Sequence, residues 1–435
     1  MKIKNRNKVN VITLGCSKNL VDSEYLMRQL KENGFDVSHD SNSSDANIVI
    51  INTCGFINDA KQESIETILQ FEKSRKKNKI DKLIVFGCLS ERYKEELIKE
   101  IPVVDKFFGV YDNKNLLEYL GADFRKELIN ERITTTPKHY AYLKISEGCD
   151  RTCSFCAIPL IKGNHKSIPI ENLVKETEFL VKNGAKEIIL IAQDLSYYGI
   201  DIYKKPKLAE LISKLSETKG VEWLRLHYAY PSKFPQDVIS VIKSKENICK
   251  YLDIPVQHIS DKMLKLMRRG NNKKQTIELI EKLRTEIPGI ALRTTLLVGH
   301  PGETDEDFNE LLDFIKFAKF ERLGVFTYSE EENTYSALNY TDSIPESVKQ
   351  ARMDKIMDVQ REISNELNSK KIGKIFKIII DRTEGDYYIG RTEFDSPEVD
   401  NEVLIHSEMN KLKIGQFYNV KITQSDEFDL YGEIN

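Results

Sequence analysis

The first third of the chain alternates between short apolar runs and amphipathic segments. The apolar runs, which predict strands, lie at residues 9–14, 46–52, 82–86 and 106–110. The amphipathic segments, which predict helices, lie at residues 22–32, 60–77, 91–100 and 115–120. Short apolar strands that alternate with helices favour a parallel sheet with helices on both of its faces.

The middle of the chain repeats a strand–helix pattern. Strand candidates lie at residues 142–146, 187–193, 223–228, 251–255, 291–298 and 324–328. Helical segments between them lie at residues 171–183, 207–216, 235–243, 274–286 and 305–317. A complete βα barrel has eight such units, so this shorter pattern predicts a (βα)₆ partial barrel.

The last part of the chain changes in texture after a long charged helix at residues 343–371. Short β-rich runs follow, separated by turn residues, at 375–380, 387–392, 402–405 and 417–423. They favour a small all-β barrel. With the mostly polar stretch 125–137 interpreted as a linker, we expect an α/β protein with three domains, at residues 7–124, 135–366 and 369–435.

Composition places the chain in an ordinary class. Hydrophobic residues make up 40% of it and charged residues 31%, which is typical of globular domains. No apolar run approaches the ~18 residues of a membrane span. We therefore expect no membrane association and a cytoplasmic location, where thiols stay reduced and more often act as ligands than form disulfides.

Three cysteines stand close together at the start of the predicted partial barrel. Cys149, Cys153 and Cys156 follow the spacing C-x₃-C-x₂-C, which can reach three corners of a cubane iron–sulfur cluster normally held by four thiolates. No fourth cysteine follows nearby, so one iron would keep a position open for a ligand. The alternatives are a zinc site that lacks its fourth ligand or a chance grouping.

Three further cysteines each follow a predicted strand of the first domain. Cys16, Cys54 and Cys88 all stand beside a glycine at the carboxyl ends of these strands, the edge at which parallel sheets bind ligands. A single cysteine there would be interpreted as an inert buried thiol, but three at equivalent positions favour a second cluster site. Cys249 stands alone and is interpreted as a packed thiol.

Polar residues also follow the predicted barrel strands, where such folds place their chemistry. Each is a candidate for binding a cofactor or substrate, or is a polar group satisfied inside the barrel. They are Gln193, Asp194, His227, Tyr228, Gln257, His258, Arg293 and the turn at residues 299–304.

The cysteine loop, with Phe155 before its last cysteine, resembles that of the radical S-adenosylmethionine (SAM) enzymes. The whole chain resembles the methylthiotransferases, which join a cluster domain, a radical-SAM barrel and a C-terminal TRAM domain. Within them it is most similar to the RimO-type branch, which acts on ribosomal protein uS12. Stretches 13–24, 252–258, 293–295 and 390–398 carry this likeness, with small departures at Ser17 and His300.

The resemblance implies methylthiolation of the β-carbon of a uS12 aspartate, with uS12 either free or on the ribosome. It implies two [4Fe-4S] clusters: Cys149, Cys153 and Cys156 would hold the one that chelates and cleaves SAM, and the other three cysteines an auxiliary one. A second SAM would supply the methyl group. The inserted sulfur would be either a sulfide of the auxiliary cluster or an external sulfur on its open iron.

The resemblance also implies neighbours and partners for these clusters. Phe155, Gln193 and Arg293 are expected near the cofactor. A reductant such as flavodoxin or ferredoxin is expected to donate electrons, and the chain is expected to act as a monomer.

Two other functions share some of these features. One is a tRNA methylthiotransferase of the same architecture, and the other is a non-catalytic iron–sulfur or zinc protein. Residues 373–435 carry seven Lys and Arg against thirteen Asp and Glu, a net charge of −6. Such a surface would repel a phosphate backbone, so we expect a basic protein substrate rather than a nucleic acid. An acidic face kept only for solubility is the alternative.

Overall fold

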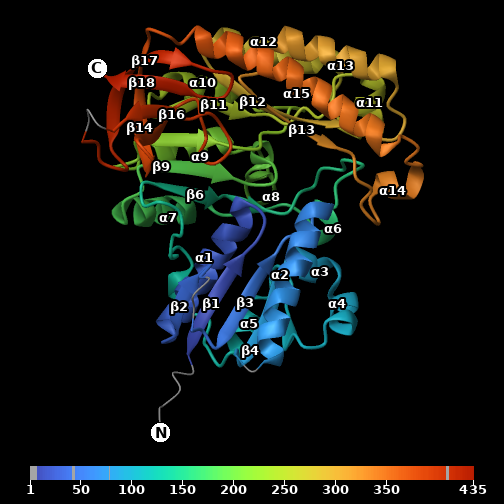
Figure 1. Cartoon of the computed structure of the whole chain (residues 1–435), viewed down its shortest axis with the longest axis vertical. Coiled ribbons are helices and arrows are strands. Elements are labelled where there is room, and N and C mark those ends of the chain that lie inside the picture. Colours follow the sequence, from blue (N-terminus) through green and yellow to red (C-terminus); the bar gives the residue numbers. More distant parts are fainter. Residues whose placement is uncertain (1–6, 42–44, 78, 408–410) are drawn as a thin grey trace.

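A computed structural model describes residues 7–41, 45–77, 79–407 and 411–435. Figure 1 shows an N-terminal α/β domain, a larger central βα unit stacked on it, and a small β-barrel at the C-terminal end of the chain. The order of α/β and all-β parts along the chain is therefore the predicted one. The differences from the prediction lie in individual strands, helices and connections.

The N-terminal domain is built around a parallel sheet with the strand order β2-β1-β3-β4-β5. Its strands are β1 (Lys8–Thr13), β2 (Asp36–His39), β3 (Ile48–Thr53), β4 (Lys82–Gly87) and β5 (Lys106–Phe107). The sequence did not predict β2. This strand lies at the sheet edge and pairs only with β1, so it needs no apolar run.

Helices cover both faces of this sheet, as predicted. One face packs against α1 (Ser17–Glu32) and α5 (Asn113–Tyr119), and the other against α2 (Asn58–Lys76), α3 (Cys88–Arg92) and α4 (Lys94–Glu100). The prediction of a single helix at 91–100 is wrong. The helix begins at Cys88 and is interrupted at Tyr93, whose φ of −126° is not helical.

The central unit is a six-stranded parallel sheet, counted over the described residues, with the order β13-β12-β11-β10-β9-β6. This confirms the (βα)₆ partial barrel. The strands are β6 (Tyr140–Lys144), β9 (Glu187–Ile191), β10 (Trp223–Leu226), β11 (Ile248–Asp253), β12 (Ala291–Val298) and β13 (Arg322–Thr327).

Helices cover the outer side of this sheet, where alternate strand residues form the largest apolar core. The helices that follow the strands are α7 (Ile170–Lys182), α9 (Leu208–Ser216), α10 (Gln236–Ser244), α12 (Lys273–Glu286), α13 (Asp305–Ala318) and α15 (Glu346–Ser369). Shorter helices are α6 (Ile158–Lys162), α8 (Ile200–Tyr203), α11 (Asp261–Leu266) and α14 (Tyr335–Asn339), and β7 (Ser146–Glu147) pairs with β8 (Lys166–Ser167).

The C-terminal strands close into the predicted small barrel, in the order β14-β15-β16-β18-β17. They are β14 (Ile375–Glu384), β15 (Tyr387–Thr392), β16 (Val403–His406), β17 (Phe417–Ser425) and β18 (Leu430–Ile434), of which β18 was not predicted. Ile379 of this barrel packs with Trp223 and Tyr251, whose positions on β10 and β11 face inward. The C-terminal barrel therefore covers part of the concave face of the partial barrel.

Charged groups also join these two barrels. Glu187 on β9 accepts hydrogen bonds from Arg225 at 2.7 Å and from Arg391 of the C-terminal barrel at 2.8 Å. All three side chains are buried. Arg391 in turn bonds Asp381, so the ion pairs form a continuous network across the junction.

The segment at 125–137 is not a free linker. Arg132 is 3% exposed and forms ion pairs with Glu24 of α1 and Glu176 of α7. It also donates to the carbonyl of Tyr142. The segment thus fastens the N-terminal domain to the partial barrel. Over the described parts of the chain, no helix is long and apolar enough to cross a membrane.

Candidate functional site

The loop that carries Cys149, Cys153 and Cys156 follows β6 and β7 at the carboxyl edge of the partial barrel. Its middle is fixed from two sides, because the Ser154 N–H donates to the carbonyl of Met267 at 3.0 Å and the Ser154 carbonyl accepts from the N–H of Ser336 at 2.7 Å. A loop held by backbone bonds in this way presents its side chains in a defined arrangement.

The three thiols of this loop lie close enough to affect one another. The pKa of Cys149 is raised to about 11, mainly by burial, with Asp194 and Cys153 also raising it and Arg151 opposing them. Burial also raises the pKa of Cys156, to which Cys153 and Cys149 add. Three thiolates would repel each other here without a cation, so the arrangement suits a positively charged metal group.

Arg269 supplies a cation directly at one of these sulfurs. Its Nη1 donates to Sγ of Cys153 at 3.1 Å, and its Nη2 donates to the Pro255 carbonyl at 2.5 Å. The hydroxyl of Tyr230 lies 3.5 Å from the same sulfur, and the Arg269 and Arg151 guanidinium carbons each lie 4.2 Å from the Tyr230 ring centre. Neither Arg269 nor Tyr230 could be predicted from the sequence, because neither belongs to a motif with a spacing typical of a chemical site.

The second set of cysteines also converges. Cys16 precedes α1, Cys54 follows β3, and Cys88 begins α3 directly after β4. Burial raises the pKa of Cys88 to about 12, with further contributions from Cys16 and Cys54. A Cβ at Gly15, whose φ is +92°, would lie 2.7 Å from Cβ of Cys54, so only glycine allows this close approach.

Helix α6 lies between the two sets of cysteines. Cys88 packs with Ala157 and Ile161, and Ala157 directly follows Cys156 in the chain. Figure 1 shows α6 at the junction of the N-terminal domain and the partial barrel. The two sets therefore lie on neighbouring sides of one short helix, although they are far apart in sequence.

A buried group of four charged side chains joins the N-terminal domain to the partial barrel near the cysteines. Asp22 comes from α1, while Lys144, Glu147 and Lys162 come from the partial barrel. Lys144 pairs with Asp22 and, at 2.6 Å, with Glu147, and Lys162 lies 3.6 Å from Asp22 and 3.5 Å from Glu147. Burial opposes the charge of Lys162, but these acids and Cys88 together raise its pKa.

The donor chemistry of both sets fits iron–sulfur clusters. Each set offers three sulfur donors, the ligand type of such clusters, and the seventh cysteine, Cys249, packs against Trp223 and Tyr251 away from both sets. No group of three His, Cys, Asp or Glu side chains in the described ranges is arranged to hold a single metal ion.

The other three predicted site residues differ in their surroundings. Phe155 packs beside His300, with ring centres 6.4 Å apart, and Gln193 is half-buried just beyond β9. Arg293 lies between two carboxylates, 3.5 Å from Asp253 and 3.4 Å from Asp400 of the C-terminal barrel. Their roles toward a cofactor stay predictions, and for Arg293 the structure adds a role in joining the barrels.

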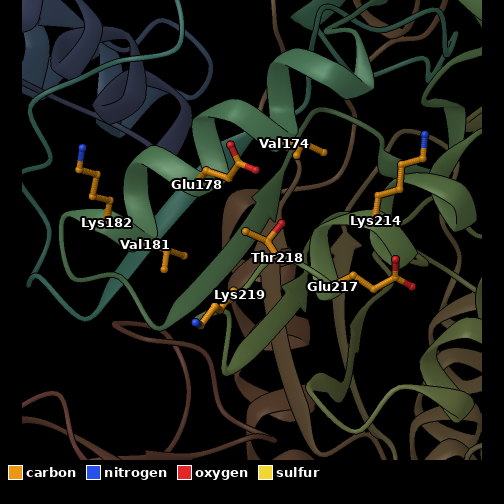
Figure 2. A pocket seen from close by; sticks show the side chains of 8 residues that line it. All are labelled: Val174, Glu178, Val181, Lys182, Lys214, Glu217, Thr218 and Lys219. Carbon is orange, nitrogen blue, oxygen red and sulfur yellow. The ribbon is translucent and has the colours of Figure 1, made fainter.

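A hollow of about 430 Å³ lies on the outer side of the partial barrel, away from the cysteines. Figure 2 shows lysine and glutamate side chains at its walls, on α7, α9 and the turn after α9. Its lining residues are Val174, Glu178, Val181, Lys182, Lys214, Glu217, Thr218 and Lys219. With neither thiols nor strand ends in its walls, it is not part of the cysteine site.

Comparison with known proteins agrees with this architecture. Residues 143–315 match the Radical SAM superfamily, residues 8–109 the uncharacterized protein family UPF0004, and residues 372–434 the TRAM domain. The radical SAM methyltransferase TsrM of Kitasatospora setae shares the fold, with a TM-score of 0.56 and 14% identity over 76% of this chain and 74% of that chain. The chain is a radical-SAM enzyme.

Similar proteins of known function show which family of radical-SAM enzymes this is. The ribosomal protein uS12 methylthiotransferase RimO of Bacteroides fragilis is 60% identical over 99% of both chains. RimO of Porphyromonas gingivalis is 57% identical, again over 99% of both chains, and RimO of Flavobacterium johnsoniae is 57% identical over 98% of both. The chain belongs to the RimO family of radical-SAM methylthiotransferases.

Proposed function

We propose that this chain inserts a methylthio group at the β-carbon of an aspartate in ribosomal protein uS12, in the cytoplasm, with SAM and two [4Fe-4S] clusters. The observation that carries the proposal is the packing of Cys88 against Ala157, next to Cys156. This packing puts one cysteine of the auxiliary set beside the residue that follows Cys156, which supports two clusters that face one substrate-binding region.

The two sets have different tasks in this proposal. Cys149, Cys153 and Cys156 hold the cluster that binds SAM, while Cys16, Cys54 and Cys88 hold the auxiliary cluster. When bound, these groups supply radical chemistry able to break an unactivated C–H bond and a site from which sulfur is inserted. An external one-electron donor such as flavodoxin or ferredoxin completes the reaction, and the chain acts as a monomer.

The charge of the C-terminal domain supports a protein substrate less strongly than the sequence indicated. The net charge of −6 led us to expect an acidic surface, but three of its acids have partners: Glu398 has Tyr140, Asp400 has Arg293 and Glu402 has Arg382. Asp381 and Asp395 are likewise paired with arginines, and Glu408 lies outside the described residues. Some of these acids join the C-terminal barrel to the partial barrel and others pair within it, so the preference for uS12 over tRNA rests on the family.

A direct assay tests the proposal. The protein is purified and reconstituted without oxygen, and its iron content is measured; about eight irons per chain are expected, roughly four for each cluster. It is then incubated with dithionite, SAM and either uS12 or tRNA. Methylthiolated uS12, found by mass spectrometry, supports the proposal. Modified tRNA with unmodified uS12 would favour the tRNA enzyme, and zinc in place of iron would exclude both enzymes.

A further inference from the structure

Lys18 is a buried cation without an ion-pair partner among the described residues. Its residue is 6% exposed, and its Nζ lies 3.8 Å from the ring centre of Tyr228. Over residues 7–41, 45–77, 79–407 and 411–435, no carboxylate oxygen lies within 4.0 Å of this Nζ. Lys144 and Lys162, also buried and in the same region, both have such partners. Burial opposes the charge of Lys18, while Glu147 and Asp253 favour it from beyond ion-pair distance and its pKa is raised. The place of a direct partner at Nζ stays open to a ligand carboxylate.

The position of Lys18 connects it to both parts of the site. It lies in the first turn of α1, two residues after Cys16 of the auxiliary set. Tyr228 follows β10 at the carboxyl edge of the partial barrel, where its φ is +62°. The ammonium group therefore lies where the auxiliary cysteines meet the mouth of the barrel.

A second polar group at this mouth lacks a partner. Oδ2 of Asp253 accepts from the N–H of Tyr228 at 3.3 Å, while Oδ1 is buried and has no hydrogen-bond partner among the described residues. Asp253 is 1% exposed. The ammonium of Lys18 can donate to an acceptor of a ligand, and Oδ1 of Asp253 can accept from a donor of the same ligand, so a polar ligand with both groups would complete this place.

We propose that Lys18 binds the carboxylate of the substrate aspartate, an inference that rests on the proposed function. The β-carbon of aspartate is bonded directly to the carboxylate carbon. If Nζ of Lys18 holds that carboxylate, the reacting β-carbon, one bond from the carboxylate carbon, is held near Cys16. A charge-assisted N–H···O bond would also satisfy the buried ammonium. Lys18 is then a substrate-binding residue that selects an acidic side chain, and a nucleic-acid substrate would offer it no carboxylate.

SAM also carries a carboxylate that Lys18 could bind. Binding experiments distinguish the carboxylate of SAM from that of the substrate aspartate. Holoenzyme with SAM and no reductant is titrated with labelled uS12, using wild-type protein, Lys18→Met and Lys18→Arg. The same titrations use uS12 in which the modified aspartate, located by mass spectrometry, is changed to asparagine. Lys82→Met is the matched control, because Lys82 also lies over a tyrosine ring, at 4.7 Å from the centre of Tyr119, but at the amino end of β4.

The proposal expects Lys18→Met to bind uS12 roughly 30-fold more weakly, as for the loss of one partner of a buried charge pair. Lys18→Arg should retain part of the affinity, and Lys82→Met all of it. Asparagine-substituted uS12 should bind wild type and Lys18→Met equally. SAM affinity and SAM cleavage without uS12 should not change in Lys18→Met.

Three results with Lys18→Met would overturn the proposal. The variant could bind both forms of uS12 equally more weakly than wild type does, it could bind uS12 with unchanged affinity, or it could lose affinity for SAM alone. Failure of the wild-type enzyme to bind or modify any uS12 is a different result, which would remove the proposed function itself and this inference with it.

Discussion

Arg269 and Cys153 form a direct contact from guanidinium to sulfur at 3.1 Å, inside a region where Arg269 is 4% exposed. Hydrogen bonds and positive charge near a cluster sulfur stabilise the reduced, more negative cluster, and so raise its reduction potential. A buried arginine keeps its charge at every relevant pH. In the proposed function, Arg269 would therefore act on the SAM-binding cluster through its ligand Cys153 rather than on the substrate.

Arg269→Leu should lower the reduction potential of the first cluster and slow reductive SAM cleavage. Outer partners of metal ligands typically matter by roughly 10–100-fold, and a loss in that range is expected. The potential is measured by a redox titration followed by electron paramagnetic resonance. Arg268→Leu is the control, since Arg268 is exposed and lies over Tyr335. Equal potentials in the two variants would contradict this role.

The two sets of cysteines should separate in function. Cys153→Ala should abolish SAM cleavage, because the cluster that binds SAM is lost. Cys54→Ala should retain cleavage to 5′-deoxyadenosine but form no methylthio product. Both are measured by chromatography of the reaction after anaerobic reconstitution. If Cys54→Ala lost SAM cleavage while the first cluster remained spectroscopically intact, the division of roles would be wrong.

The ion pair between Arg391 and Glu187 should matter for stability. Removing one partner leaves the other charge buried, which costs about 3–5 kcal/mol, so Arg391→Met should lower the free energy of unfolding by that order. Arg382→Met is the matched control, because Arg382 pairs with Glu384 and Glu402 on the surface and such pairs contribute about 0–1 kcal/mol. Denaturant unfolding gives both values, and equal effects would contradict the prediction.

Docking of the C-terminal barrel should weaken in acid. Burial opposes the charges of Glu187, Asp381 and Asp395, but neighbouring arginines hold the pKa of each below its ordinary value. A carboxylate whose folded pKa is lowered stabilises the fold above its ordinary pKa, and this contribution is lost as the pH falls through the folded value.

The thermal midpoint should therefore stay nearly constant from about pH 8 to 6 and fall below about pH 4–5, the ordinary range of carboxylates. In Arg391→Met the thermal midpoint should fall less steeply with falling pH, because Glu187 and Asp381 have lost one of the arginines that lower their pKa values. Scanning calorimetry across this range measures both profiles. Identical slopes for wild type and variant would show that these groups do not control the acid response.

Apolar periodicity was sufficient to predict all six strands of the partial barrel and the cysteine positions on the first sheet. It could not predict β2, whose four residues at the sheet edge include one apolar side chain, Val37, nor the packing of segment 125–137. Arg132 is polar in sequence and buried in the fold, because Glu24 and Glu176 neutralise it. Hydropathy records the polarity of a residue and not its partner in the fold, and for the same reason a count of charges did not show that Asp400 lies beside Arg293.

The C-terminal barrel has a consequence for how the enzyme is made. It supplies Arg391 to Glu187 and Ile379 to Trp223 and Tyr251, so the inner face of the catalytic barrel is incomplete until the last residues leave the ribosome. A nascent chain that stops before residue 372 would expose this face to water and to other chains.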